Sequence, residues 1–135
     1  MKKKYLIVVA DYYKDIADGL IRSALKIIPK KNIIKIIKVP GAFEIPVTIS
    51  KNINKYDGFV ALGCVIKGET PHFDLISKAA INAIMDLSVE NKKPIGNGII
   101  TCLNKKQALE RANPEGKNIG GNAVSAVLQT LANFK

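Results

Sequence analysis

The sequence has no Trp, only two cysteines and a single histidine. Cys64 and Cys102 lie far apart and form no Cys-x-x-Cys pair, which argues against a zinc site or a disulfide framework. No apolar run approaches the ~20 residues of a membrane-spanning helix. The N-terminal stretch MKKKYLIVVA begins like a signal peptide, but its apolar part is short and charged residues follow it. These absences predict a cytoplasmic protein without a metal centre or a membrane partner.

The composition is that of a compact globular domain. The chain has 135 residues, of which 47% are apolar and 24% are charged. A chain of this length removes roughly two thirds of its unfolded surface from water, so it needs no disulfide or metal to hold a core. No linker, repeat or low-complexity segment divides it, and we expect residues 1–135 to form one domain.

The charge balance is strongly basic. Lysine and arginine total 21 against 11 acidic residues, a formal net charge of +10. Such a balance attracts phosphorylated metabolites as well as nucleic acids. However, Arg22 and Arg111 are the only arginines, and the lysines are scattered in short clusters. Phosphate-reading surfaces favour arginine, so the pattern favours a solvated basic surface over a nucleic-acid-binding stripe.

Strand-like and helix-like segments alternate along the chain. Apolar or β-branched runs predict strands at residues 5–10, 33–39, 59–66 and 94–101. Helical periodicity predicts helices at residues 15–28, 44–54, 70–90, 104–112 and 122–134, with a Gly-rich loop at 113–121. The repeated β-α order predicts an α/β protein of three α/β/α layers, a flavodoxin-like fold with a four-stranded parallel sheet.

In such sheets, ligands bind beyond the carboxyl ends of the strands, near the topological switch point. The loops to consider are therefore residues 11–15, 39–46 and 67–73 and the loop after Thr101. The loop at 67–73 precedes a long helix whose free N–H groups could hold an anion. Thr70 and Pro71 also suit an ordinary helix start, and for the cap alone we favour that simpler interpretation.

His72 is the only histidine and falls in the first turn of that helix. The positive helix end favours a neutral imidazole, which can accept a proton near pH 7. An acid–base role and an ordinary surface or core histidine both remain open at this point. Among neighbouring candidates, Glu44 is equally suited to a polyol ligand or to a helix N-terminus, and we expect Phe43 to pack in the core.

Other candidates follow the first strand and the fourth. Tyr12 and Tyr13 could stack on a planar heterocycle or be ordinary loop aromatics, and the sequence leaves this pair undecided. Arg111 precedes the Gly-rich loop and could hold a phosphate, although an exposed helix-end cation is the commoner role. Lys117, within that loop, could assist.

Three segments resemble the lumazine synthase family. They are VPGAFEIP, GCVIKGETPHFD, and QALERA followed by a Gly-rich loop and AVSA, in order and with matching spacing. The resemblance implies a transferase that condenses 5-amino-6-(D-ribitylamino)uracil with 3,4-dihydroxy-2-butanone 4-phosphate. The product would be 6,7-dimethyl-8-ribityllumazine, formed in the penultimate step of riboflavin biosynthesis without a metal or organic cofactor.

The resemblance also implies roles for individual residues. His72 would transfer protons, and Glu69, Thr70 and Arg111 would bind the butanone phosphate. The ribitylaminouracil would be bound by Tyr12, Ala42, Phe43, Glu44, Cys64, Val65, Ile66 and Asn97. The family's sites lie between subunits of a pentamer, so Asn97 and Arg111 would come from the subunit adjacent to the one that offers His72.

Three positions depart from the family pattern. Tyr12 replaces the usual Phe, and Asn97 stands where many relatives have an aromatic residue. Ile119 stands in place of a loop lysine, for which Lys117 could substitute. Two other functions remain to be tested, a flavodoxin-like module that binds a flavin or lumazine without catalysis, and a basic nucleic-acid-binding protein.

Overall fold

The computed structural model describes residues 2–68 and 71–134 of the chain. Its strands form one sheet in the order β2-β1-β3-β4, and every neighbouring pair is parallel. The predicted four-stranded parallel sheet is therefore confirmed. The strands are β1 (Lys4–Ala10), β2 (Ile33–Val39), β3 (Gly58–Ile66) and β4 (Ile95–Cys102).

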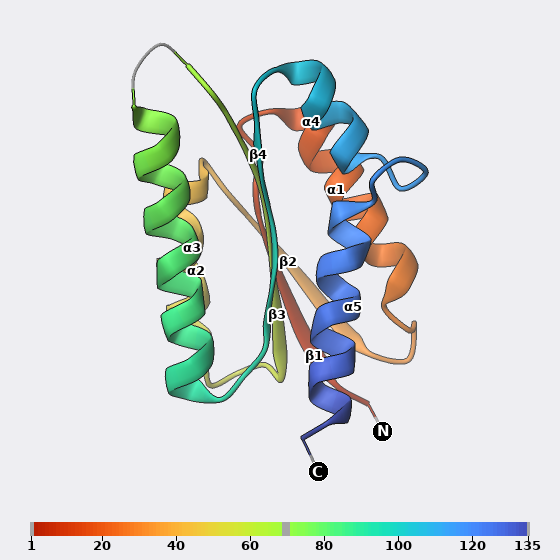
Figure 1. The fold of residues 1–135 in the computed structure, drawn as a ribbon. Helices are drawn as coiled ribbons and strands as arrows, with labels where there is room; N and C mark the ends of the chain where they lie inside the picture. The colour runs from red at the N-terminus through yellow and green to blue at the C-terminus, as the bar shows by residue number, and fades with distance from the viewer. Residues whose placement is uncertain (1, 69–70, 135) are drawn as a thin grey trace.

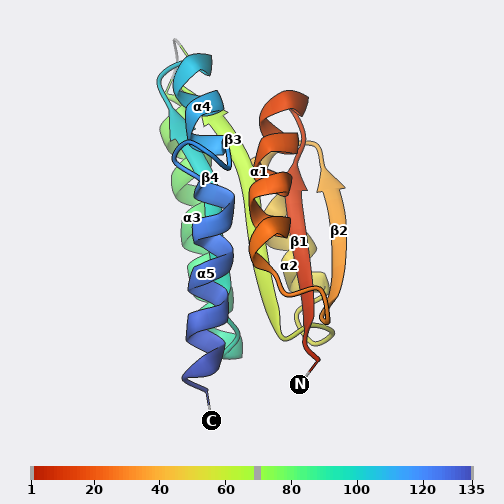
Figure 2. The same cartoon turned by 90° about the vertical axis from the view of Figure 1, so that its right-hand side faces the viewer.

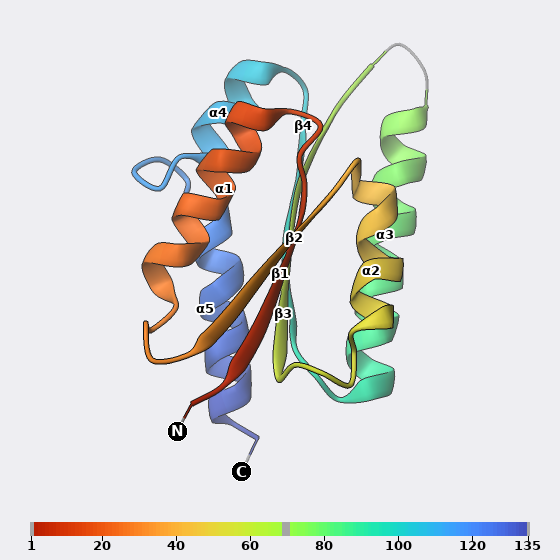
Figure 3. The same cartoon turned by 180° about the vertical axis from the view of Figure 1, so that it is seen from behind.

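Helices cover both faces of the sheet. They are α1 (Lys14–Ile27), α2 (Ile45–Lys51), α3 (His72–Asn91), α4 (Lys105–Ala112) and α5 (Ile119–Ala132), with a 3₁₀ turn at Ala42–Glu44. Figure 1 shows the sheet edge-on, with α2 and α3 on one side and α1, α4 and α5 on the other. Figure 2 looks onto the layer of α1, α4 and α5, and Figure 3 shows the arrangement from behind. This is the three-layer arrangement that the alternating pattern predicts.

Two apolar cores flank the sheet, because successive side chains of a strand point to opposite faces. In β1, Ile7 and Val9 belong to the core beneath α1, α4 and α5, whereas Leu6 and Val8 belong to the core beneath α2 and α3. All four side chains are fully buried. Each such burial contributes roughly 1.5–3 kcal/mol relative to exposure, so the central strands form a rigid base for the loops at their ends.

The Gly-rich segment before the last helix is shorter than the sequence pattern predicts. We expect a loop over residues 113–121, but α5 already begins at Ile119, so Gly120 lies in its first turn. A Cβ on Gly120 would overlap the Leu20 carbonyl oxygen of α1. This glycine therefore serves the close approach of two helix backbones rather than a turn, and the loop prediction is wrong there.

Glycines also bring α5 close to β4. A Cβ on Gly96 would overlap the carbonyl oxygen of Ala123 in α5, and one on Gly98 would overlap Leu62 of β3. Because Gly96 lacks a side chain, α5 packs directly on the strand backbone there, whereas the absence of a side chain at Gly98 makes room for Leu62. The fourth strand is thus held between α5 and its neighbour β3.

Among residues 2–68 and 71–134, no helix is long and apolar enough to cross a bilayer.

Candidate active site

A pocket of about 530 Å³ lies at the carboxyl ends of β1, β2 and β3. The chain leaves β1 toward one edge of the sheet and β3 toward the other, so this is the switch point at which α/β sheets bind ligands. The lining residues come from four segments: Tyr12, Tyr13, Gly41, Ala42, Phe43, Glu44, Cys64, Val65, Ile66, His72 and Ile76. The structure thus brings together nine of the candidates named from the sequence.

The segment after β2 forms one wall of the pocket. Ala42 is buried in the core beneath α2 and α3, while the side chain of Phe43 is 61% exposed. Our prediction that Phe43 packs in the core is therefore wrong. The 3₁₀ turn at Ala42–Glu44 places only one of its three residues inward, so the aromatic ring projects from the surface. Glu44 is half-buried beside it.

The end of β3 forms the floor. The strand is fully buried from Gly58 to Gly63, whereas Cys64, Val65 and Ile66 are half-buried because the helices no longer cover the strand there. Burial, aided by the nearby Cys102 thiol, raises the pKa of Cys64 to about 12. Cys64 is therefore a neutral thiol at physiological pH rather than a nucleophile.

His72 is the first residue of α3 and faces the same pocket. Ile76 follows one helical turn later, so the two side chains share a face of the helix. Glu69 and Thr70, which the resemblance assigns to the phosphate loop, lie outside the described residues, as does the predicted Thr70 cap. The imidazole therefore stands at the N-terminal end of α3, with the end of β3 as the opposite surface.

Tyr12 and Tyr13 complete the pocket from the loop after β1. Tyr12 is 75% exposed, and its ring lies perpendicular to that of Tyr13, with centroids 4.9 Å apart. Tyr13 is half-buried, and this burial, followed by the influence of Cys64 and Tyr12, raises the pKa of its phenol. Tyr13 is thus a neutral hydroxyl near pH 7.

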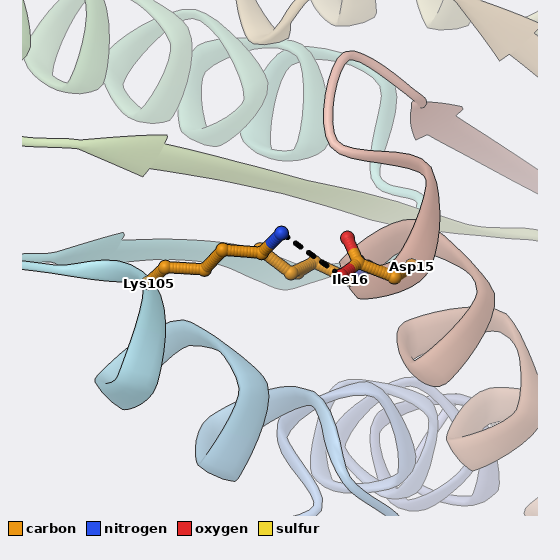
Figure 4. A network of polar contacts seen from close by, with 3 residues as sticks. All are labelled: Asp15, Ile16 and Lys105. Atoms are coloured by element: carbon orange, nitrogen blue, oxygen red, sulfur yellow. Dashed lines mark hydrogen bonds and ion pairs between the residues drawn. The ribbon is translucent and has the colours of Figure 1, made fainter.

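An ion pair ties the start of α1 to the start of α4. Lys105 Nζ lies 3.1 Å from Asp15 Oδ2, and the Asp15 carboxylate also accepts a hydrogen bond from the Ile16 N–H (Figure 4). The hydrogen bond from Lys105 lowers the pKa of Asp15. This pair connects the loop of Tyr12 and Tyr13 to the helix that carries Arg111.

Arg111 and Asn97 do not line the pocket. The Arg111 guanidinium donates a hydrogen bond to the Thr101 carbonyl oxygen at 2.7 Å and lies 3.6 Å from Cys102 Sγ. Asn97 accepts a hydrogen bond from the Ile99 N–H and lines a separate cavity of about 130 Å³ between α3 and β4. Within one chain, neither side chain meets the pocket that His72 lines.

The structure also describes the loop in which Ile119 stands in place of the family's lysine. Ile119 is half-buried and packs against the core beneath α1, α4 and α5, whereas Lys117 is exposed. The Lys117 backbone N–H donates to the Glu110 carbonyl oxygen, which folds the loop back onto α4. The side chain of Lys117 therefore remains in solvent on the same loop.

Sequence reasoning left two lining residues, Gly41 and Ile76, without a role, and it left the role of Tyr13 undecided. Ile76 was detectable, because it follows His72 by four residues and a helix places such residues on one face. Gly41 adjoins the candidates at residues 42–44. Tyr13 carried only an ambiguous signal, since it is adjacent to Tyr12 and neighbouring loop residues share no fixed direction.

The pocket offers a partly exposed aromatic ring, a carboxylate, half-buried apolar floor residues and one imidazole. These groups suit a planar, polyhydroxylated molecule whose reaction requires proton transfer. Within the part of the chain that the structure describes, no cluster of three or more His, Cys, Asp or Glu side chains could hold a metal ion.

Comparison with known proteins identifies a single family. The family model described as 6,7-dimethyl-8-ribityllumazine synthase matches residues 2–135. The protein of that name from Bartonella tribocorum is 46% identical over 138 residues, covering 98% of this chain and 91% of its own length. The one from Methylobacterium radiotolerans is 45% identical over 132 residues, covering 96% of this chain and 80% of its own length.

Proposed function

This chain belongs to the 6,7-dimethyl-8-ribityllumazine synthase family, and we propose that the pocket lined by His72 is where it carries out that reaction. The chain is a transferase of riboflavin biosynthesis. It condenses 5-amino-6-(D-ribitylamino)uracil with 3,4-dihydroxy-2-butanone 4-phosphate to give 6,7-dimethyl-8-ribityllumazine. One observation carries the assignment of the site: the only histidine and the exposed Tyr12 line the same pocket.

The ribitylaminouracil occupies the part of the pocket between the 3₁₀ turn and the end of β3. Tyr12 stacks on the pyrimidine ring, which its 75% exposure supports. Glu44 accepts hydrogen bonds from ribityl hydroxyls, and Ala42 and Phe43 contact the same chain. Cys64, Val65 and Ile66 form the floor, and their half-buried side chains leave the strand end accessible to the ring.

His72 moves protons among the reacting atoms. The amine of the uracil attacks the butanone carbonyl, and loss of water gives an imine. Elimination then releases phosphate, and the remaining amine closes the ring as a second water leaves. Each step transfers protons between nitrogen, carbon and oxygen, which suits an imidazole near neutral pH. Holding both substrates together supplies most of the acceleration, since proximity lowers a barrier by up to ~7–11 kcal/mol.

The phosphate of the butanone binds near the start of α3. Glu69 and Thr70 belong to this loop, and the positive end of the 20-residue helix favours an anion there. Arg111 completes the phosphate site from an adjacent subunit, with Lys117 on the same loop region as a second cation. Asn97 of that subunit faces the pyrimidine. Arg111 and Asn97 lie outside the pocket of their own chain, which supports a site shared between two subunits.

We therefore propose a homopentamer in which each site lies between neighbours. Exposed apolar side chains on α3 support such contacts, since Leu75, Met85 and Val89 are each more than 60% exposed. The two free thiols suit a cytoplasmic location, where cysteines remain reduced. We propose residues 1–135 as one domain, with two small-molecule substrates and no nucleic-acid or membrane partner.

The test is formation of lumazine from the two purified substrates, followed by its absorbance and fluorescence. We expect turnover at neutral pH by a particle whose light-scattering mass is five times that of the chain or a multiple of this. Retention of lumazine without turnover would instead indicate a binding module. Steep salt-dependent retention of DNA or RNA would favour the nucleic-acid alternative.

A further inference from the structure

We propose that Tyr13 is a positioning residue for the pyrimidine substrate. Its ring restrains the Tyr12 ring in an orientation that leaves one face of Tyr12 available for stacking. The inference rests on the proposed function, because it assigns Tyr12 to the pyrimidine. It concerns the role of Tyr13, which the sequence leaves undecided. Tyr13 lies outside the three segments that carry the family resemblance.

Tyr13 is the anchored member of the pair. Its backbone is fixed as the N-cap residue of α1, and its carbonyl oxygen accepts a hydrogen bond from the Ala17 N–H at 2.9 Å. Its half-buried ring packs against the core beneath α1, α4 and α5. A residue held by both backbone and ring provides a fixed surface for its neighbour.

Tyr12 is the exposed member. Three quarters of the residue is open to solvent, and it precedes the N-cap rather than lying in the helix. The contact with Tyr13 is perpendicular, with ring planes at 87° and centroids 4.9 Å apart. A perpendicular neighbour covers at most one face of a ring, so at least one face of Tyr12 stays open to the pocket. The geometry therefore restrains the ring without occupying its stacking surface.

Restraint of this kind affects binding through entropy. A free surface ring samples several rotamers, and binding a ligand by stacking must select one of them. A ring already held in the stacking orientation loses less freedom on binding. Because aromatic pairs of this geometry contribute modestly, loss of Tyr13 is expected to weaken pyrimidine binding by about two- to tenfold.

A competing explanation is that Tyr13 binds the substrate through its hydroxyl. Burial raises the pKa of that phenol, so near pH 7 it is a neutral donor. The two explanations differ in their response to removal of the oxygen alone. Tyr13→Phe keeps the ring contact and should preserve binding if Tyr13 acts through Tyr12.

The experiment is a double-mutant cycle of Tyr12→Leu, Tyr13→Leu and the double variant, with Tyr13→Phe alongside. For each protein we would measure kcat, KM for each substrate, and the affinity for 6,7-dimethyl-8-ribityllumazine by its fluorescence. The chain has no Trp, so the ligand signal is observed against a weak protein background. Tyr56→Leu is a matched control, since it removes a perpendicular pair with Phe59 outside the pocket lining.

We expect Tyr13→Leu to raise KM for the uracil and Kd for the lumazine by about two- to tenfold, leaving kcat and KM for the butanone phosphate nearly unchanged. In the Tyr12→Leu background, Tyr13→Leu should then have no further effect. Tyr13→Phe and Tyr56→Leu should bind like the unmodified protein. If Tyr13→Leu does not fold, Tyr13→Met takes its place under the same criteria.

Three outcomes would overturn the proposal: unchanged pyrimidine affinity in Tyr13→Leu, an equal loss in both backgrounds, or a loss in Tyr13→Phe as large as in Tyr13→Leu. Failure of the proposed function looks different, because the unmodified protein itself would then form no lumazine. The two hypotheses are thus tested separately.

Discussion

The candidate residues fall into two regions that face different surroundings. The pocket half, defined as Tyr12, residues 42–44, residues 64–66 and His72, surrounds one cavity at the switch point of the sheet. The β4 half, defined as Asn97 and Arg111, lies on the edge strand β4 and on α4, outside that cavity. Loops converge where neighbouring strands diverge, so the first set shares a pocket. Asn97 is instead an exposed residue of the edge strand, where another copy of the chain could reach it.

The two halves also differ in how they are stabilised. The pocket half lies on half-buried strand ends and a 3₁₀ turn, and its rings and carboxylate are accessible. In the β4 half, the Arg111 guanidinium is already hydrogen-bonded to the Thr101 carbonyl oxygen of its own chain. Under the proposed division, its remaining donors are the ones that would bind a phosphate in the site of a neighbour. The comparison of the two halves therefore supports our proposal that one chain carries complementary parts of two different sites.

The largest expected effect is that of replacing His72, the proposed proton-transfer residue of the pocket half. We expect His72→Ala to lower kcat by roughly ten- to a thousandfold, because it removes proton transfer and leaves substrate proximity intact. Steady-state kinetics with both substrates measures this, and light scattering serves as the control for assembly. Complete loss of turnover with intact assembly and substrate binding would contradict the proximity account.

The next largest effect concerns the rate at which Cys64, the thiol on the pocket floor, is alkylated. With a pKa of about 12, Cys64 holds roughly a thousandfold less thiolate at pH 8 than an ordinary cysteine does. We expect iodoacetamide to alkylate native Cys64 at least about a hundredfold more slowly than the urea-unfolded chain, as peptide mass spectrometry would measure. Similar rates in the two states would mean that the floor is open to solvent.

The raised pKa of Cys64 also determines whether the stability of the protein rises or falls with pH. The native pKa of Cys64 lies above the ordinary thiol value, so its contribution to stability is complete below the unfolded pKa. That contribution declines as pH rises from about 9 through about 12. Urea unfolding at pH 8 and pH 10.5 should show a larger decrease for the unmodified protein than for Cys64→Ala.

The β4 half is tested by Arg111→Ala. We expect KM for the butanone phosphate to rise by roughly ten- to a hundredfold, the effect of losing a charged hydrogen bond, with a smaller change in KM for the uracil. Initial-rate kinetics at varied phosphate substrate measures it. An unchanged KM would remove Arg111 from the phosphate site.

Mixing the two impaired variants, His72→Ala and Arg111→Ala, tests the division into halves directly. If each site takes His72 from one chain and Arg111 from its neighbour, a co-refolded one-to-one mixture of the two alanine variants restores about a quarter of the sites. Sites built from one chain alone would recover nothing beyond the sum of the separate variants. The double variant, mixed with neither partner, is the matched control.

The smallest expected effect concerns the ion pair that connects the two halves. The side chains of Lys105 and Asp15 are 59% and 52% exposed, so solvent screens their attraction. We expect Lys105→Ala to shift Tm by no more than about 1–3 °C, without changing kcat. Thermal melts at low and high salt measure it. A large loss of activity would show that the pair couples the halves.

Much of the fold was predictable because its signals are local. The apolar runs predicted as the first and third strands correspond to β1 and β3, although β3 begins at Gly58, one residue earlier than predicted. The start of α5 was not predictable, since Gly120 has the composition of a loop and its helical role depends on contact with Leu20. Such contacts between distant segments leave no periodic pattern in the sequence.

Some features of the site were likewise predictable from local signals in the sequence, and others were not. The position of His72 after the third strand, at a helix start, indicated its pocket without further information. The exposure of Phe43 did not follow, because an apolar ring between two prolines is equally compatible with the core or the surface. The separation of Arg111 from the pocket was expected only from the family resemblance, because the residue pattern alone does not determine on which side of the sheet α4 lies.

The missing side chain of Gly96 has a practical consequence for engineering this protein. An alanine at this position would overlap the carbonyl oxygen of Ala123 and push α5 away from β4. The loop ahead of α5 folds back onto Glu110, so the displacement would reach the neighbouring Arg111 and misalign its guanidinium. A mutational scan restricted to the pocket lining would overlook Gly96, although a substitution there would also disturb the residue that we propose as the phosphate ligand.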